Sequence, residues 1–253
     1  LIKKAQCFST LSKFLLLNVP FSSSPITIRY NTEKIESCEI MKFDCIIIGA
    51  GSMGIAAAYF LAKAGKKVCA IDAFDPPHTN GSHHGETRII RYAYGEGLEY
   101  VPLALRAATL WQQLERQVNK PLLLQTGVVN IGDKENPFVQ TVIESAEKFD
   151  LPLEVLNAEE MMKRWPGIQV QDNMIAAFEP TSGVLLVEEC VAAYKELAVN
   201  EGATLRMNEP VQHITFGNTV TVTTSVNTFE ADTCIVCAGA WTNKLLQQFT
   251  LPL

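Results

Sequence analysis

The sequence predicts an α/β protein in which a Rossmann-like domain (βαβ with GxGxxG) carries an inserted α+β domain. The main observation is a strand–turn–helix–strand unit over residues 43–72, with the glycine motif on its turn. Strands also alternate with helices in the last part of the chain. The section 124–185 breaks this alternation, which indicates an insertion between two halves of one nucleotide-binding domain.

The unit begins with a short apolar run, FDCIII at residues 43–48, which is typical of a strand buried on both faces. The stretch IAAAYFLAKAG then predicts a helix whose alanines pack closely and which ends at Gly65. A second apolar strand, KKVCAID at residues 66–72, ends in Asp72. This order places the intervening turn where phosphate binding needs it.

The turn GAGSMG, residues 49–54, supplies the three glycines of the motif. Gly49 allows the tight turn, Gly51 lets a pyrophosphate approach the backbone, and Gly54 lets helix and strand pack closely. The helix N-terminus adds free N–H groups and a positive dipole for phosphates. Asp72 can accept hydrogen bonds from ribose hydroxyls. The alternative is a glycine-rich turn without a ligand, with Asp72 a surface strand end.

Periodicity and stop signals predict the remaining elements. Helices are expected at 101–118, 137–150, 159–168 and 187–202, and a last one begins at Trp241. Strand patterns predict strand–turn–strand at 121–132, a turn at Pro180–Gly183, a hairpin with a two-residue turn at Gly217-Asn218, and a buried strand over 233–240 that ends on Gly239.

Composition suits a folded protein with a core, since 47% of the residues are hydrophobic and 19% are charged. The net charge of -6 argues against broad nucleic-acid binding, because no excess of cations exists to neutralise phosphates. No apolar run is long enough to span a bilayer. We therefore expect neither a nucleic-acid nor a membrane partner.

The first forty residues lack the sharp pattern that begins at Met41. A targeting peptide would have more arginine and fewer acids, and a domain would have periodicity. We expect residues 1–40 to be a non-native or unstructured extension, with Met41 the natural start. N-terminal sequencing of the native protein checks this.

The seven cysteines are dispersed in apolar surroundings, which does not resemble a disulfide framework and fits a reducing cytoplasm. Cys234 and Cys237 form a CxxC that could indicate a metal or redox site. The local pattern is a strand, however, where positions i and i+3 face opposite sides. We expect two diverging strand cysteines and no metal site.

The stretch DAFDPPHTNGSHHGETRIIRYAYGEG, residues 72–97, concentrates histidines, arginines and glycines just after the second strand. In isolation, His83 and His84 would be surface histidines, and Arg88 and Arg91 one exposed helix face. The βαβ unit alone does not distinguish NAD from FAD. The small residues Ala238 and Gly239 at a late strand end would let a large cofactor pass close by.

Six motifs together resemble the monomeric sarcosine oxidase and N-methyltryptophan oxidase family of FAD-dependent amine oxidases. They are GAGSMG, the 72–97 stretch, YVPLALRAATLW, RWPGI, FEPTSGVL and GAW, and they run in order from Met41 onward. The resemblance implies a FAD-binding domain in two parts, 41–123 and 186–253, with the substrate domain at 124–185. It implies a cytoplasmic monomer whose partners are a secondary amino acid and oxygen.

The resemblance also implies the chemistry. Such enzymes pass a hydride equivalent from the N-methyl group or adjacent C–H bond to flavin N5. The imine then hydrolyses and releases formaldehyde. Oxygen reoxidises the flavin and is reduced to hydrogen peroxide. Sarcosine is the favoured substrate and N-methyl-L-tryptophan the alternative. The other alternative is a non-catalytic FAD-binding fragment, and an NAD dehydrogenase would lack yellow absorbance.

The resemblance assigns roles to residues of the 72–97 stretch. Arg88 would lie beside the flavin ring with His84 nearby, and Arg91 would hold the substrate carboxylate. The loop around Tyr94 and Glu96 would be a flap beside Arg91. The expected cofactor-binding residues are Gly49, Gly51, Ser52, Met53, Gly54, Asp72, Ala73, Ser82, His83, Thr87, Arg88, Val211, Ala238, Gly239 and Trp241. For Trp165 we expect core packing instead.

The sequence departs from this family at its end. The family attaches its flavin to a cysteine in the C-terminal part and activates oxygen with a lysine, and neither maps onto this chain. We therefore expect the covalent attachment cysteine outside these residues, and a chain that is part of a longer product.

Overall fold

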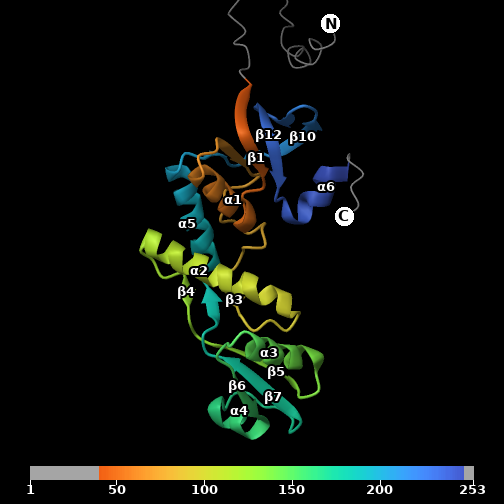
Figure 1. Cartoon of the computed structure of the whole chain (residues 1–253). Coiled ribbons are helices and arrows are strands. Elements are labelled where there is room, and N and C mark those ends of the chain that lie inside the picture. The colour runs from red at the N-terminus through yellow and green to blue at the C-terminus, as the bar shows by residue number, and fades with distance from the viewer. Residues whose placement is uncertain (1–39, 248–253) are drawn as a thin grey trace, which may run out of the picture. The chain divides into compact units, whose positions relative to one another are not determined.

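A six-stranded sheet in the order β10-β11-β12-β1-β2-β9 is the largest sheet of the computed structural model, which describes residues 40–247. Figure 1 labels three of its strands, β1, β10 and β12. β1, β2, β9 and β12 run parallel, and β10 and β11 extend the sheet antiparallel. The strands are β1 (Met41–Ile48), β2 (Val68–Ile71), β9 (Thr204–Arg206), β10 (Val211–Phe216), β11 (Val220–Thr224) and β12 (Thr228–Val236). The predicted extension, residues 1–40, lies outside the described residues except for Ile40.

The predicted βαβ unit is confirmed as β1, α1 (Ser52–Lys63) and β2. The helix begins at Ser52, inside the glycine motif, and not after Gly54 as expected, because the residues Ser-Met-Gly already adopt helical geometry. Gly65 has φ +79, the left-handed conformation that glycine adopts without strain and that ends the helix.

The sheet buries apolar side chains on both faces. One cluster joins β1 and β2 to α1, α5 (Val187–Asn200) and α2 (Val101–Val118). A second cluster joins the opposite face of β1 and β2 to β10, β11, β12 and Leu245 of α6 (Thr242–Leu246). Because residues 45–48 of β1 and 68–71 of β2 are buried on both sides of the sheet, they form continuous hydrophobic runs in the sequence.

Two three-stranded sheets occur in the rest of the chain, in the orders β3-β8-β4 and β5-β7-β6. Their strands are β3 (Arg88–Ile90), β4 (Leu123–Leu124), β5 (Val128–Asp133), β6 (Glu154–Asn157), β7 (Met174–Glu179) and β8 (Gly183–Leu185). The remaining helices are α3 (Pro137–Lys148), α4 (Ala158–Arg164) and the short η1 (Leu98–Tyr100) and η2 (Gly239–Trp241). The helices predicted at 101–118, 137–150, 159–168 and 187–202 are confirmed within a few residues at their ends.

Two details of the predicted strands were wrong. The hairpin loop has three residues, 217–219, because Phe216 pairs with Val220, and the Gly217 N–H donates to the Thr219 carbonyl at 3.1 Å. The late strand ends at Val236, before Gly239, and its last three residues are half-buried, with Val236 at the wall of a cavity.

The two cysteines of the CxxC diverge as predicted. Cys234 packs in the second apolar cluster and Cys237 in the first, on the other side of the sheet. Burial raises the pKa of the Cys234 thiol to about 12, so it stays protonated and unreactive near neutral pH.

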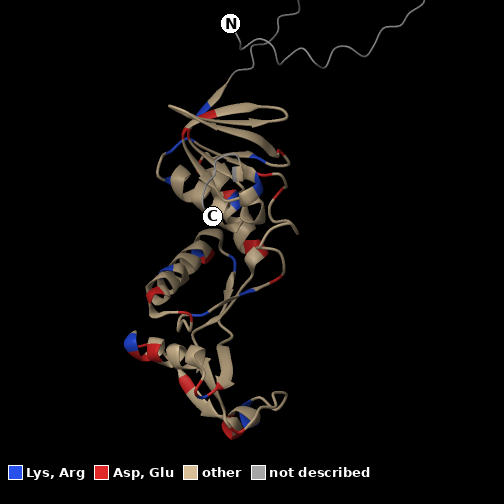
Figure 2. Ribbon diagram, turned by 90° about the vertical axis from the view of Figure 1, so that its right-hand side faces the viewer, with Lys and Arg blue, Asp and Glu red and all other residues tan. Residues whose placement is uncertain are grey.

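Acidic and basic residues are interspersed along the described residues (Figure 2). No helix among residues 40–247 is long and apolar enough to cross a bilayer.

Candidate cofactor and substrate site

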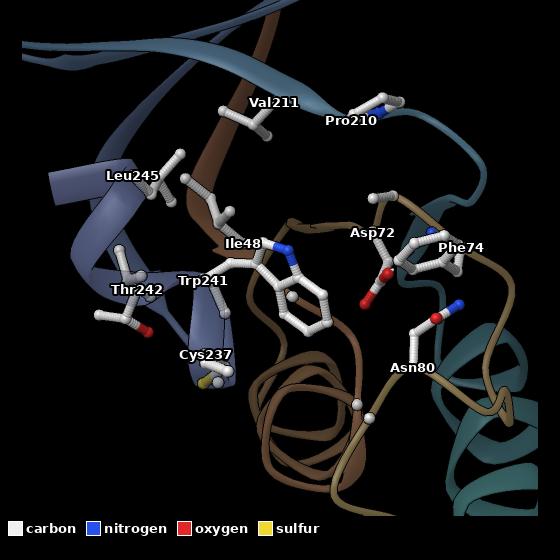
Figure 3. Close-up of a pocket in the computed structure, with 18 of the residues that line it drawn as sticks. Ile48, Asp72, Phe74, Asn80, Pro210, Val211, Cys237, Trp241, Thr242 and Leu245 are labelled. Carbon is white, nitrogen blue, oxygen red and sulfur yellow. Dashed lines mark hydrogen bonds between the residues drawn. The ribbon is translucent and has the colours of Figure 1, made fainter. Parts of the chain in front are cut away.

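A cavity of about 1150 Å³ lies where β1 and β2 end and α1 begins. Its other walls come from the segment after β2, the start of β10 and the η2–α6 region. Figure 3 shows Asp72, Phe74 and Asn80 on one side and Trp241, Thr242 and Leu245 on the other. The carboxyl ends of parallel strands at such a crevice are where α/β folds bind nucleotides.

The glycines of the first turn have no room for side chains. A Cβ on Gly49, which has φ +92, would lie 2.4 Å from the Cys237 carbonyl oxygen. A Cβ on Gly54 would lie 1.8 Å from the Gly49 oxygen. Strand, turn and helix therefore pack at backbone distance, and Gly51 and Ser52, at the start of α1, line the cavity.

Asp72 closes the same turn from the second strand. One carboxylate oxygen accepts a hydrogen bond from the Ala50 N–H at 2.6 Å, and the other accepts from the Phe74 N–H at 2.9 Å. Each carboxylate oxygen has a further lone pair, so Asp72 can still accept hydrogen bonds from a ligand in the cavity.

His83 is buried with 2% of its surface exposed, so it is not the surface histidine that it would be in isolation. Its Nε2 accepts from the His78 N–H at 3.2 Å, which leaves the proton of the neutral ring on Nδ1. Nδ1 faces Gly51, where a Cβ would lie 3.3 Å away. Burial, followed by the neighbouring His78, lowers the pKa of His83 below its ordinary value of 6.5.

His78 brings an unpaired polar atom to the cavity wall. Its Nδ1 accepts from the Asn80 N–H at 3.1 Å, so Nε2 carries the proton in the neutral ring. Nε2 is buried, lies 3.7 Å from an Asp72 oxygen, and has no hydrogen-bond partner among the described residues. Asp72 and His78 therefore offer an acceptor and a donor side by side, which suits the ribose hydroxyls of a dinucleotide, because a hydroxyl both donates and accepts.

Aromatic rings line one wall. Phe74 lies edge-on to His78 with ring centroids 5.1 Å apart, and its centroid is 6.5 Å from that of Trp241. Trp241 is 48% exposed beside the cavity. In contrast, Trp165 packs edge-on against Phe178 at 5.4 Å, away from this wall.

The loop after the cavity wall is held by Arg88, which lies at the start of β3 and not on a helix. Its guanidinium donates to the carbonyl oxygens of Ser82, His84 and Thr87. Glu188 of α5 fastens the same loop, since its carboxylate accepts from the Gly85 N–H at 3.0 Å and lies 3.5 Å from His84 Nδ1.

Arg91 lies just beyond β3. Its guanidinium lies over the Tyr94 ring at 5.1 Å and the Phe138 ring at 5.3 Å, and it donates to the Glu96 carboxylate. The Arg91 side chain is 25% exposed. A planar cation packed on two rings, with an exposed carboxylate as its partner, is suited to exchanging that partner for another carboxylate.

The structure brings most predicted cofactor residues to one cavity. The residues on its wall are Gly49, Gly51, Ser52, Met53, Asp72, Ala73, Ser82, His83, Val211, Ala238, Gly239 and Trp241. Gly54, His84, Thr87, Arg88 and Arg91 do not line it. Sequence reasoning missed Phe74, His78 and Asn80, which lie within the 72–97 stretch and were predictable from its density of rings and polar groups.

The glycine turn, the acid at the second strand end and the cavity that they line define a dinucleotide-binding α/β protein. The family model for FAD dependent oxidoreductases matches residues 44–253. The chain therefore belongs to the FAD dependent oxidoreductase family, and the orphan donor of His78 and the side-chain-free turn fit its cofactor.

Two relatives are informative. The chain is 49% identical over 213 residues to monomeric sarcosine oxidase of Bacillus sp. (strain B-0618), covering 83% of this chain and 55% of the relative. It is 45% identical over 209 residues to N-methyl-L-tryptophan oxidase of Salmonella heidelberg (strain SL476), covering 82% and 56%. The chain thus spans about half the length of these curated relatives. The predicted family resemblance is confirmed.

Solved structures agree on the fold. NikD, an unusual amino acid oxidase essential for nikkomycin biosynthesis, matches with a TM-score of 0.75 at 26% identity, over 82% of this chain and 54% of its own. L-proline dehydrogenase from P. horikoshii matches with a TM-score of 0.72 at 23% identity, over 83% and 56%. The predicted α/β fold class is confirmed.

Proposed function

We propose that this chain is part of a FAD-dependent oxidase of secondary N-methyl amino acids, with sarcosine preferred and N-methyl-L-tryptophan the alternative. One observation carries the proposal. One stretch of chain lines the dinucleotide cavity with Ser82 and His83 and carries, a few residues later, the Arg91 guanidinium packed on the Tyr94 and Phe138 rings. The higher identity to the sarcosine enzyme, 49% against 45%, supports sarcosine.

We assign the cofactor part to residues 41–123 and 186–253 and the substrate part to 124–185. The sheet β5-β7-β6 and helices α3 and α4, which fall within 124–185, support this division. We further propose that the protein is a cytoplasmic monomer, with its flavin-linking cysteine outside these residues. Sedimentation of the purified protein checks the monomer.

FAD, when bound, accepts the hydride equivalent from the substrate and passes electrons to oxygen. The chain's own residues bind and orient. Arg91 takes the substrate carboxylate in place of Glu96, which then turns to solvent because its side chain is 47% exposed. Arg88 and His84 belong to the loop that contributes Ser82 and His83 to the cavity wall. Their positive charge and donor would favour negative charge on a flavin ring bound beside this loop.

Arg91→Lys tests the carboxylate role, because an ammonium cannot form the paired bonds of a guanidinium. With FAD and oxygen, sarcosine should yield formaldehyde and peroxide, and the variant should lower kcat/KM about tenfold or more, mainly through KM. Arg106→Lys is the matched control, since Arg106 is exposed on α2 with no recorded partner among the described residues.

Both this chain and the full product of its gene should be assayed, with N-methyl-L-tryptophan as second substrate. If the full product turns over substrate and this chain does not, this chain is a FAD-binding fragment of the proposed enzyme. Faster turnover of N-methyl-L-tryptophan reverses the substrate preference. No turnover of either substrate by the FAD-loaded full product contradicts the proposal.

A further inference from the structure

The buried carboxylate of Glu179, at the end of β7, contacts the backbone next to Arg91 although 86 to 87 residues separate them in sequence. We propose that Glu179, together with Ser145, is a positioning residue that fixes the direction of Arg91 for carboxylate binding. The proposal rests on the role given to Arg91 above and adds two residues that the sequence analysis did not identify.

Glu179 has 0% of its surface exposed. Its two carboxylate oxygens accept from the Tyr92 N–H at 3.0 and 3.2 Å, and one of them accepts from the Ala93 N–H at 3.1 Å. The described residues provide no ion-pair partner for it. Successive N–H groups of one short segment are therefore what stabilises this buried charge.

α3 holds the next residues of the same segment. The Ser145 hydroxyl, on a residue with 0% exposure, donates to the Tyr94 carbonyl at 2.8 Å. A Cβ on Gly95 would lie only 2.5 Å from the Phe138 ring, so the ring packs directly against the backbone there. The Arg91 guanidinium lies over the same ring. Backbone groups on Tyr92, Ala93 and Tyr94 are thus fixed from two separate elements.

A carboxylate without a cation is costly to bury, and the hydrogen bonds to backbone N–H groups offset that cost. An apolar residue at position 179 would leave the Tyr92 and Ala93 N–H groups unpaired in the interior. The carboxylate therefore holds the backbone that follows Arg91 against the end of β7. This fixes the position of the Arg91 backbone from which its side chain extends.

Because this arrangement already restricts the Arg91 side chain, the side chain loses less conformational entropy when it binds a carboxylate. Its ring contacts come from Tyr94, which Ser145 holds, and from Phe138 of α3. If residues 92–95 became mobile, the Arg91 guanidinium would lose both ring contacts and its fixed direction together. Positioning by Glu179 and Ser145 thus accounts for a rigid cation at the end of an otherwise glycine-rich loop.

The test uses the whole chain with FAD and arginine labelled with 13C and 15N. The Nε–Hε signal of Arg91 is identified by its loss in Arg91→Lys. Acetate is the probe, and acetamide, which has no charge, is the control ligand. Glu179→Gln keeps the size of the side chain but turns one acceptor into a donor facing the amides. Ser145→Ala removes the second anchor, and Glu144→Gln on α3 removes an exposed charge with no recorded partner among the described residues.

We expect Glu179→Gln to broaden or shift the Arg91 signal and to weaken acetate binding about tenfold, the effect of losing one charge-assisted bond. Ser145→Ala should act in the same direction, and Glu144→Gln should leave both unchanged. FAD affinity should stay the same in all three, which separates positioning from general unfolding.

Three outcomes separate the two proposals. If acetate binds none of the chains but the Arg91 signal loses order only in the Glu179 and Ser145 variants, positioning stands and the substrate role of Arg91 fails. If the Arg91 signal and acetate affinity are unchanged in folded Glu179→Gln, the positioning proposal is wrong. If Glu179→Gln does not fold, Ser145→Ala decides by the same two readouts.

Discussion

At the scale of single residues, the cavity depends on a histidine that is kept neutral beneath the glycine turn. His83 fills the space next to Gly51 and Gly81, where a Cβ on Gly81 would lie 2.5 Å from its ring. Its Nε2 is engaged as an acceptor by the His78 N–H. A protonated ring could not accept that bond, so the folded state favours the neutral form.

The lowered pKa of His83 predicts a pH dependence of stability. The unfolded chain takes up a proton near the ordinary pKa of 6.5, whereas the folded chain resists it until lower pH. The free energy of unfolding from this group should therefore be fully present above pH 6.5 and fall as the pH drops below it. Urea unfolding of the wild type and His83→Gln at several pH values measures the difference.

His213→Gln is the control, because His213 is exposed on β10. The His83→Gln chain should lose less stability than the wild type on acidification, and the His213 variant should behave as the wild type. Parallel pH curves for His83→Gln and the wild type would show that His83 protonation is not coupled to folding.

The sequence could place the 72–97 stretch near the cofactor, because the glycine motif determines where in the fold that stretch must lie. Glu179 was not, since its partners, the amides of Tyr92 and Ala93, are distant along the chain. No local pattern distinguishes it from a solvated acid at a strand end. The resemblance placed the loop around Glu96 beside Arg91, but nothing in the sequence indicated that the Glu96 carboxylate accepts a hydrogen bond from the Arg91 guanidinium.

At the scale of elements, the β1–α1 turn sets the distance between the sheet and its first helix. The Gly54 position touches the Gly49 carbonyl so closely that strand, turn and helix behave as one packed unit. Helix α1 starts within the motif, so its first turn, whose N–H groups have no partner inside the helix, borders the cavity.

Gly54→Ala should destabilise the chain by about 2–3 kcal/mol, because the new methyl group must displace backbone and not a flexible side chain. Gly167→Ala is the matched control. A Cβ at Gly167 meets nothing within 4 Å, so this change should alter the free energy of unfolding by no more than about 1 kcal/mol. Denaturant unfolding of both variants gives the comparison, and equal effects would contradict the close packing described for the turn.

Elements with a long, regular pattern were predicted well, whereas short ones were not. α2 and α5 show clear apolar faces with defined ends, and both were located from the sequence. β3, β6, β7, β8 and β9 were missed. These strands have three to six residues, and their pairing comes from distant segments, as when Arg88 pairs with Leu185. The hairpin loop is also one residue longer than predicted, because Phe216 pairs with Val220 and leaves Thr219 in the loop.

At the scale of the whole molecule, the cavity joins segments from both ends of the described chain. Residues near 50, near 75 and near 240 line it together, and the parallel pairing of β1 with β12 brings them into register. The chain spans about half the length of its curated relatives, but it contains all the residues that line the cavity. FAD binding can therefore be tested on this chain directly.

Calorimetric titration of the purified chain with FAD, and separately with NAD, is the most direct measurement. The account predicts one FAD bound per chain, with NAD at least about tenfold weaker, and a rise in the unfolding temperature that grows with FAD concentration. No binding of FAD, or equal binding of NAD, would contradict the assignment of the cavity as the site of a flavin dinucleotide.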